Sequence, residues 1–161
     1  MVDEESATVR TERSGKLLEG EDHVVSGGGC VVRLGGLYTG DQGAHNYWCS
    51  GAGETKEFSA KGNGLINLIH YEDAAGAVVK CLQNPAQVRG EIFLVSDGVP
   101  MSRREIAAAA ASSPRYAESS GKVLFTGGEE VDGKKYNSSK IRNVLGWAPK
   151  YASFADFMKG Q

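Results

Sequence analysis

Short apolar segments that alternate with helical patterns constrain this chain more than any other feature of its sequence. The segment 30–36 (CVVRLGG) is a β-branched run bounded by glycines, and 65–69 (LINLI) and 91–95 (EIFLV) are similar runs. Runs of this length that are apolar at almost every position are typical of strands buried on both faces of a parallel sheet. Because helical patterns separate these runs, the order of elements predicts an α/β fold with a parallel sheet.

Local start and stop signals place the helices between these strands. Apolar spacing predicts one helix over 14–25 and another over 72–84, the second closed by the Asn-Pro pair that follows it. Ser102 and Glu105 have the spacing of a capping box at the start of a third helix. Ser153 is expected to cap a short helix near the C-terminus.

Composition limits the class of protein. The chain has 161 residues, of which 40% are hydrophobic and 24% charged, so we expect one globular domain. Its net charge of −2 disfavours nucleic acid as a partner. No apolar run approaches the roughly 18 residues that a membrane span requires, so no membrane partner is expected.

The N-terminus and the cysteines indicate an intracellular setting. The first residues, MVDEESATVR, have neither the charge nor the apolar core of a signal or transit peptide. The three isolated cysteines favour reduced thiols. The cytoplasm is therefore the default expectation, and an organelle stays open if the N-terminus is incomplete.

A long segment without a clear pattern follows the first strand, from 37 to 64. Loops beyond about 12–15 residues are uncommon unless they carry function or are disordered. Within this segment lies GAHNYW, which is unusually aromatic. Two interpretations stay open: a substrate lid whose aromatic side chains stack on a ring, or a loop that Trp48 pins to the core. The sequence contains no recognised zinc spacing, so no metal site is expected.

Polar residues follow the predicted strands, where ligands bind in open α/β sheets. His70 ends one strand, and a histidine there has a pKa suited to acid or base chemistry. The alternative for His70 is a structural role. For Asp73, three residues later, we favour hydrogen bonds to backbone amides in the first turn of the next helix.

Four segments in order carry a resemblance to a known family. They are VVRLGGLYTG, NLIHYEDAAGAVVKCL, GEIFLVSDGVPMSRREI and GKKYNSSKIRNVLGWAPKYASF. Together they resemble the C-terminal half of extended and atypical short-chain dehydrogenases, the NAD-dependent epimerase/dehydratase group. The resemblance implies a partial NAD(P)-binding Rossmann fold. Its core would span 10–36 and 65–98, with a loop or lid over 37–64 and a small C-terminal substrate-side subdomain over 99–161.

The resemblance also implies a site. The loop after the first strand would pass the nicotinamide of NAD or NADP, which makes these residues cofactor-binding candidates: Gly35, Gly36, Leu37 and Tyr38. The substrate-binding candidates are His45, Asn46, Tyr47, Asn67 and His70. His70 is also a weak catalytic candidate.

Two parts of the family's machinery do not match in this sequence. A glycine-rich turn between a strand and a helix, which would hold the cofactor pyrophosphate, is not found. The segment before the first strand lacks the catalytic Tyr-x-x-x-Lys, and the match at Tyr136 and Lys140 is better explained by a helix start. We therefore expect the chain alone to bind NAD or NADP weakly and to be inactive.

Two hypotheses about function remain. In the first, a longer parent protein is an NAD(P)-dependent oxidoreductase or epimerase that acts on a sugar-like or other hydroxyl substrate. In the second, the chain is a non-catalytic Rossmann-like binding or regulatory domain that needs a partner chain to complete its sheet. An N-terminal half or a homo-oligomer would cover the open edge that about three strands leave.

Overall fold

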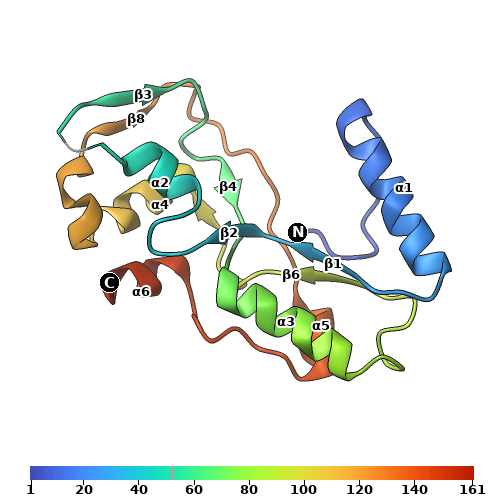
Figure 1. Cartoon of the computed structure of the whole chain (residues 1–161). Coiled ribbons are helices and arrows are strands. Elements are labelled where there is room, and N and C mark those ends of the chain that lie inside the picture. The colour runs from blue at the N-terminus through green and yellow to red at the C-terminus, as the bar shows by residue number, and fades with distance from the viewer. Residues whose placement is uncertain (52) are drawn as a thin grey trace.

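The computed structural model describes residues 1–51 and 53–161, and these form two lobes of mixed α/β structure (Figure 1). The first lobe holds the longer strands, with helices beside them. Its elements are α1 (Glu12–Ser26), β1 (Val31–Leu34), β2 (Gly36–Tyr38), β5 (Leu68–His70), α3 (Tyr71–Gln83), β6 (Ile92–Val95) and α5 (Ser139–Leu145).

The second lobe is built from short strands and short helices. Its elements are α2 (Ala44–Cys49), β3 (Lys56–Phe58), β4 (Leu65–Ile66), β7 (Met101–Ser102), α4 (Arg103–Ala110), a 3₁₀ helix (Pro114–Ser119), β8 (Val123–Phe125) and α6 (Phe154–Lys159). In Figure 1, α2 and α4 lie between the β3–β8 pair and α6.

The strands pair mostly in parallel, as the sequence predicts. β1 pairs with β6, β2 with β5 and β3 with β8, all in parallel, whereas β4 and β7 are antiparallel. β1 runs into β2 through Gly35, so along this ribbon the neighbouring strand changes from β6 to β5. We call the point of change the strand fork and define it by Gly35, Gly36, Asn67, Leu68 and Asp97.

Each lobe has its own apolar cluster, and the two clusters meet at the ribbon formed by β1 and β2. In the first lobe, Phe93 and Val95 of β6 are fully buried against Ile141 of α5. In the second, Ile106 of α4 and Phe154 of α6 are buried in the other cluster, together with Tyr38 of β2. The strand fork is therefore held from both sides.

Capping explains where the helices begin. Ser102 and Glu105 form the expected capping box at α4, and the Ser153 side chain accepts from a backbone amide at the start of α6. The first helix begins earlier than the sequence indicates, because Thr11 is its N-cap. The hydroxyl of Ser14 accepts from the backbone amide of Thr11 and completes a second capping box.

The segment 37–64 is more ordered than its sequence suggests, apart from residue 52, which lies outside the described residues. It contains the end of β2, the helix α2 and the strand β3. The run 65–69, predicted as one strand, forms two strands instead. Asn67 separates β4, which pairs with β7, from β5, which pairs with β2.

The edge of β1 that faces away from β6 has no strand partner among the described residues. Hydrogen bonds from Val31 and Gly35 reach carbonyls at the β6 side. Because N–H groups alternate along a strand, those of Val32 and Leu34 point to the open edge. The helix α1, every residue of which the structure describes, buries none of its side chains.

Candidate functional site at the strand fork

The strand fork brings together the carboxyl ends of β1 and β6 and the start of β5. The carboxyl end of β5, at His70, lies beside the end of β2 at Tyr38. The amide of Gly36 donates to the carbonyl of Asn67 at 2.7 Å, and the amide of Asp97 donates to the carbonyl of Leu68 at 2.8 Å. A Cβ on Gly35 would lie 2.8 Å from the carbonyl oxygen of Asn67, closer than van der Waals contact allows. Glycine is therefore required at position 35, where the backbone that leads into β5 passes close to the junction of β1 and β2.

Tyr38 ends β2 and places its ring in the core, not in an open cleft. The ring is fully buried and meets the rings of His70 and Phe154 edge to face, with centroids 5.2 and 5.0 Å apart. Its hydroxyl has no hydrogen-bond partner among the described residues. Burial and the nearby Asp97 carboxylate raise the pKa of Tyr38, so the hydroxyl stays protonated.

His70 caps the helix α3. Its Nδ1 accepts from the amide of Glu72 at 3.2 Å, which requires that nitrogen to carry no proton. Burial lowers the pKa of His70, which favours the neutral ring that the cap needs. The ring also packs against Tyr151 and Phe157, with centroids 4.2 and 4.7 Å away. This geometry gives His70 a structural role in starting α3.

Asn67 fixes a distant segment over the fork. Its side-chain amide donates to the carbonyl of Lys134 at 2.6 Å, and its oxygen accepts from the amide of Tyr136 at 2.9 Å. Both polar ends of the Asn67 side chain are thus engaged with backbone. Lys140, the other member of the Tyr-x-x-x-Lys match, forms an ion pair with Glu91 at 2.8 Å.

The three candidates of the aromatic segment lie on α2 and face different surroundings. His45 is buried and packs its ring against Phe154, 5.0 Å away, which links α2 to Tyr38. Asn46 accepts from the hydroxyl of Tyr116 at 2.9 Å. Tyr47 is 71% exposed. The structure therefore does not bring these three side chains together with Asn67 and His70 around one cavity.

Asp97, which the sequence reasoning missed, is the titratable group closest to the fork's centre. It is 5% exposed, and its Oδ1 accepts from the amide of Val99 at 2.8 Å. Its Oδ2 has no partner among the described residues. Burial raises the pKa of Asp97 to about 6. The signal was present in the sequence, because this aspartate follows an apolar strand with only Ser96 between them.

Two of the helix starts that follow strands, those of α3 and α4, do not form a pyrophosphate site. At α3 the ring of His70 occupies the first turn, and at α4 the Ser102–Glu105 box does so. Anion binding at a helix start needs free amides approached by a glycine-rich backbone. These residues therefore do not fit the cofactor's phosphates, and no step through NAD can be assigned to them.

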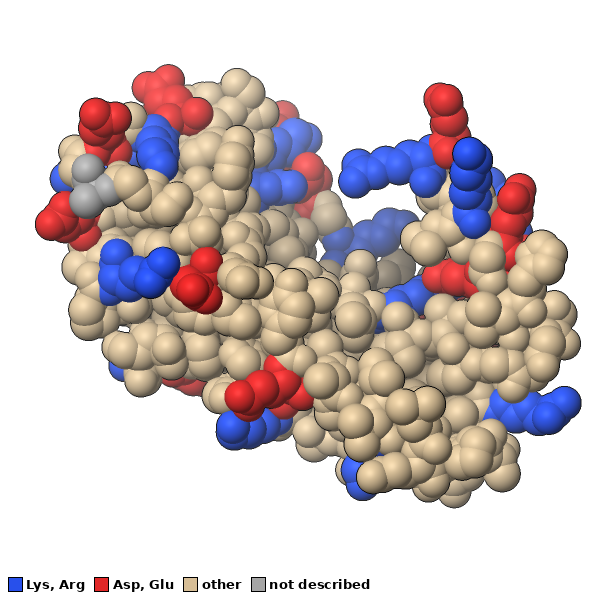
Figure 2. All heavy atoms as spheres, viewed as in Figure 1, with Lys and Arg blue, Asp and Glu red and all other residues tan. Residues whose placement is uncertain are grey.

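A cleft beside β1 is the largest opening near the fork. Its volume is about 550 Å³, and we call it the β1 cleft. Figure 2 shows the hollow between α1 and the second lobe, with basic side chains around it. One wall is apolar, from Val32, Leu34 and Leu94. On β1, Arg33 pairs with Glu21 of α1, with Nε and Oε2 3.0 Å apart.

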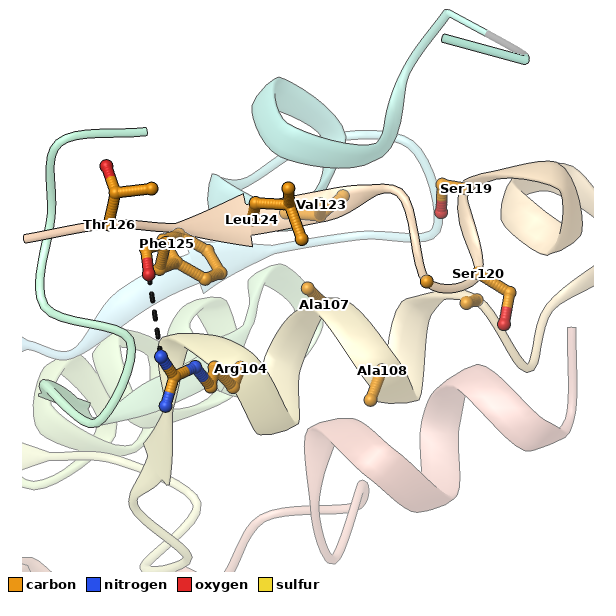
Figure 3. A pocket seen from close by; sticks show the side chains of 11 residues that line it. Arg104, Ala107, Ala108, Ser119, Ser120, Val123, Leu124, Phe125 and Thr126 are labelled. Atoms are coloured by element: carbon orange, nitrogen blue, oxygen red, sulfur yellow. Dashed lines mark hydrogen bonds between the residues drawn. The ribbon is translucent and has the colours of Figure 1, made fainter. Parts of the chain in front are cut away.

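A second groove, of about 480 Å³, lies between α4 and β8 and contains none of the predicted site residues (Figure 3). Small residues from α4 and the turn before β8 form one side of its lining, and Val123, Leu124 and Phe125 of β8 form the other. Arg104 is its one charged side chain, and the guanidinium is engaged by both carboxylate oxygens of Glu129 at 2.6 Å. Within the described residues, no group of three His, Cys, Asp or Glu side chains is placed to hold a metal ion.

Comparison with solved structures identifies the fold. A dTDP-glucose 4,6-dehydratase from Bacillus anthracis in complex with NAD superposes with a TM-score of 0.76 at 14% identity, covering 99% of this chain and 53% of that one. A UDP-glucuronic acid 4-epimerase from Bacillus cereus, with UDP-glucuronic acid and NAD, gives 0.71 at 14%, covering 98% and 54%. A dTDP-glucose 4,6-dehydratase from Streptomyces venezuelae with NAD gives 0.68 at 18%, covering 91% and 47%.

These likenesses confirm the expected fold: a partial Rossmann-like α/β fold of the kind found in NAD-dependent sugar epimerases and dehydratases. The chain spans about half the length of the solved structures that it matches. No protein-family model and no curated protein matches the sequence. Of the helices in the described residues, none combines the length and the apolar character that crossing a bilayer requires.

Proposed function

We propose that this chain is the substrate-side part of an NAD(P)-dependent oxidoreductase or epimerase that acts on a sugar-like hydroxyl substrate. The observation that carries the proposal is the strand fork, where the carboxyl ends of β1 and β6 meet the start of β5, in a fold also found in a protein solved with NAD and UDP-glucuronic acid. Ligands in open α/β sheets bind at that edge.

In this proposal the candidate residues act in two ways. Gly35 to Tyr38 form the backbone that passes the nicotinamide, and the absence of a side chain at Gly35 is what lets β5 approach. Asn67 and His70 shape the substrate side by fixing the segment 134–136 and the start of α3. On α2, the exposed Tyr47 is proposed to face the substrate, whereas the buried His45 and the hydrogen-bonded Asn46 hold the helix in place.

The cofactor would supply the hydride acceptor and donor in the complete protein. Because the starts of α3 and α4 do not fit its phosphates, we propose that the phosphate-binding part of the site lies in another part of the complete protein. The isolated chain is accordingly expected to show no hydride transfer between NADPH and a sugar nucleotide.

The test is to isolate the native protein from its source with an antibody against this chain. Intact mass and released nucleotide are then measured after denaturation. We expect a chain heavier than 17.1 kDa, or a tightly bound second chain, together with NAD(H) or NADP(H). A native complex of either kind that contains no nicotinamide nucleotide would refute the oxidoreductase proposal, as would turnover of NADPH by the isolated chain.

A second candidate function rests on the open edge of β1. In this alternative the chain is a non-catalytic binding or regulatory domain, and a partner chain completes its sheet. The unpaired edge of β1 and the unburied α1 favour it, because exposed strand edges recruit further strands. A native complex that contains a second chain but no nucleotide would support this candidate.

The same edge predicts that the isolated chain self-associates. Size-exclusion chromatography with light scattering at two concentrations should give an average mass above 17.1 kDa that rises with concentration. Val32→Pro removes an N–H that points to the open edge and should lower the associated fraction at least several-fold. Val131→Ser, at an exposed apolar position away from β1, serves as the control and should change nothing. A monomer at both concentrations would contradict the prediction.

A further inference from the structure

Two cysteines lie together at the end of the sheet opposite to the strand fork. Cys30 directly precedes β1, and Cys81 lies in the last turn of α3. Although they are far apart in sequence, Cys30 packs against the apolar cluster that contains Cys81, and both side chains line one pocket. The fold thus turns two cysteines that look isolated in the sequence into an adjacent pair.

The pair is reachable from the surface. Cys81 is 6% exposed and Cys30 is half-buried, and both line a pocket of about 300 Å³. The walls of this pocket are apolar, from Val32, Val78 and Leu82 among others. An uncharged disulfide suits such surroundings better than a thiolate does.

The two thiols have too few neighbouring ligands for a tetrahedral metal site among the described residues. Zinc sites of that kind use four protein ligands, and no third His, Cys, Asp or Glu joins the two thiols. The remaining chemistry of two adjacent thiols is a two-electron oxidation. Cys49, the third cysteine, lies apart in the second lobe, where its thiol faces the carbonyl of Ala107.

We propose that Cys30 and Cys81 are a dithiol modification site that a small-molecule disulfide, such as oxidised glutathione, converts to an intrachain disulfide. The thiolate of Cys30, the more exposed of the two, attacks one sulfur of the oxidant and releases the first thiolate. Cys81 loses its proton and attacks the Cys30 sulfur, which releases the second. The two cysteines lose two electrons and two protons, and the oxidant becomes two thiols.

The new bond ties the end of α3 to the start of β1 and closes a long loop in the unfolded chain. A cross-link of this kind stabilises mainly by restricting the unfolded state. The reaction is slow at neutral pH, because burial raises the pKa of the Cys30 thiol to about 11, and raises the pKa of Cys81 as well. The charged neighbours Glu91 and Lys140 act on Cys30 in opposite directions.

The experiment treats the reduced, folded chain with oxidised glutathione and follows intact mass under non-reducing conditions. We expect the loss of two hydrogens, no retained glutathione, and a peptide map that joins Cys30 to Cys81. The rate should rise about tenfold per pH unit from about pH 7 to about pH 9, as the thiolate fraction does. The melting temperature should rise by about 5–10 °C and return with dithiothreitol.

Two single variants provide the control. Cys49→Ser should keep the cross-link and the rise in melting temperature, whereas Cys30→Ser should lose both. A stable glutathione adduct on Cys30, a cross-link that involves Cys49, or no reaction with the folded chain at any of these pH values would overturn the proposal. None of these outcomes depends on whether the parent protein binds NAD, so the proposal stands apart from the proposed function.

Discussion

Replacing Asp73 with alanine is expected to destabilise the chain by about 3 kcal/mol, because two buried hydrogen bonds to its side chain are lost. The carboxylate is 5% exposed and accepts from the backbone amides of Lys150 at 2.7 Å and Tyr151 at 3.1 Å. Without it, both amides lose their partner where α3 meets the segment before α6. Asp73→Asn keeps one acceptor and should cost about half as much.

Urea unfolding at neutral pH measures these differences, and hydrogen exchange locates them. Exchange at the amides of Lys150 and Tyr151 should accelerate more than exchange in β6. Glu72→Gln is the matched control, since this exposed carboxylate binds the side chain of the same Lys150 and should change stability little. If Asp73→Ala and Glu72→Gln proved equally mild, the anchoring role of Asp73 would be wrong.

Asp73 also illustrates which parts of the site the sequence could predict. The expectation that its carboxylate binds amides was right, but the amides were expected in its own helix and belong instead to a segment more than seventy residues later. Sequence spacing reports local hydrogen bonds, such as the Ser102–Glu105 box, because both partners lie within one turn. It carries no information about which distant backbone folds over a given carboxylate.

The helix α2 was missed for a local reason. Its N-cap is Gly43, at φ 122°, and the cap makes no side-chain hydrogen bond, so the usual start signal is absent. A signal was present in the burial pattern, because His45, Trp48 and Cys49 are spaced as one face of a helix and are all buried. The expectation that Trp48 pins this segment to the core is consistent with its 8% exposure.

The division of 65–69 into two strands could not be predicted, because Asn67 looks like a polar interruption within one apolar run. What separates β4 from β5 is their choice of partners, β7 on one side and β2 on the other. That choice depends on long-range pairing, which the residues of the run itself do not encode. The α/β class followed from the order of elements, whereas the geometry of the strand fork depended on such pairings.

The second large effect concerns Asp97, whose carboxylate should weaken the fold at neutral pH. Burial raises the pKa of Asp97 to about 6 in the folded chain, whereas an unfolded aspartate titrates near its usual value of about 3.9. The folded state therefore binds the proton more tightly than the unfolded state. Stability from this group is greatest at low pH, falls as pH rises from about 4 to about 6, and stays low above that.

Asp97→Asn removes the charge and should stabilise the chain above pH 6. A shift of about two pKa units corresponds to an upper limit of about 3 kcal/mol, and we expect about 1–3 kcal/mol at pH 8. The asparagine oxygen can still accept from the amide of Val99. Urea unfolding of both chains should show the advantage shrinking through pH 6 and vanishing near pH 4. Asp41→Asn, at an exposed position, should show no such pH-dependent advantage.

Asp97→Asn also tests whether the carboxylate of Asp97 has a hydrogen-bond partner in Tyr38. Tyr38 offers a buried hydroxyl without a partner, and the carboxylate raises the pKa of that hydroxyl, so the two groups act on each other. If the Tyr38 ring shifts so that its hydroxyl comes within donating distance of Oδ2, the carboxylate gains a bond, and Asp97→Asn would then destabilise the chain at pH 8. Tyr38→Phe distinguishes the cases. If the carboxylate is unpaired, Asp97→Asn should stabilise the chain at pH 8 equally with and without Tyr38→Phe. If the Tyr38 hydroxyl donates to the carboxylate, Asp97→Asn should stabilise the chain only in the presence of Tyr38→Phe.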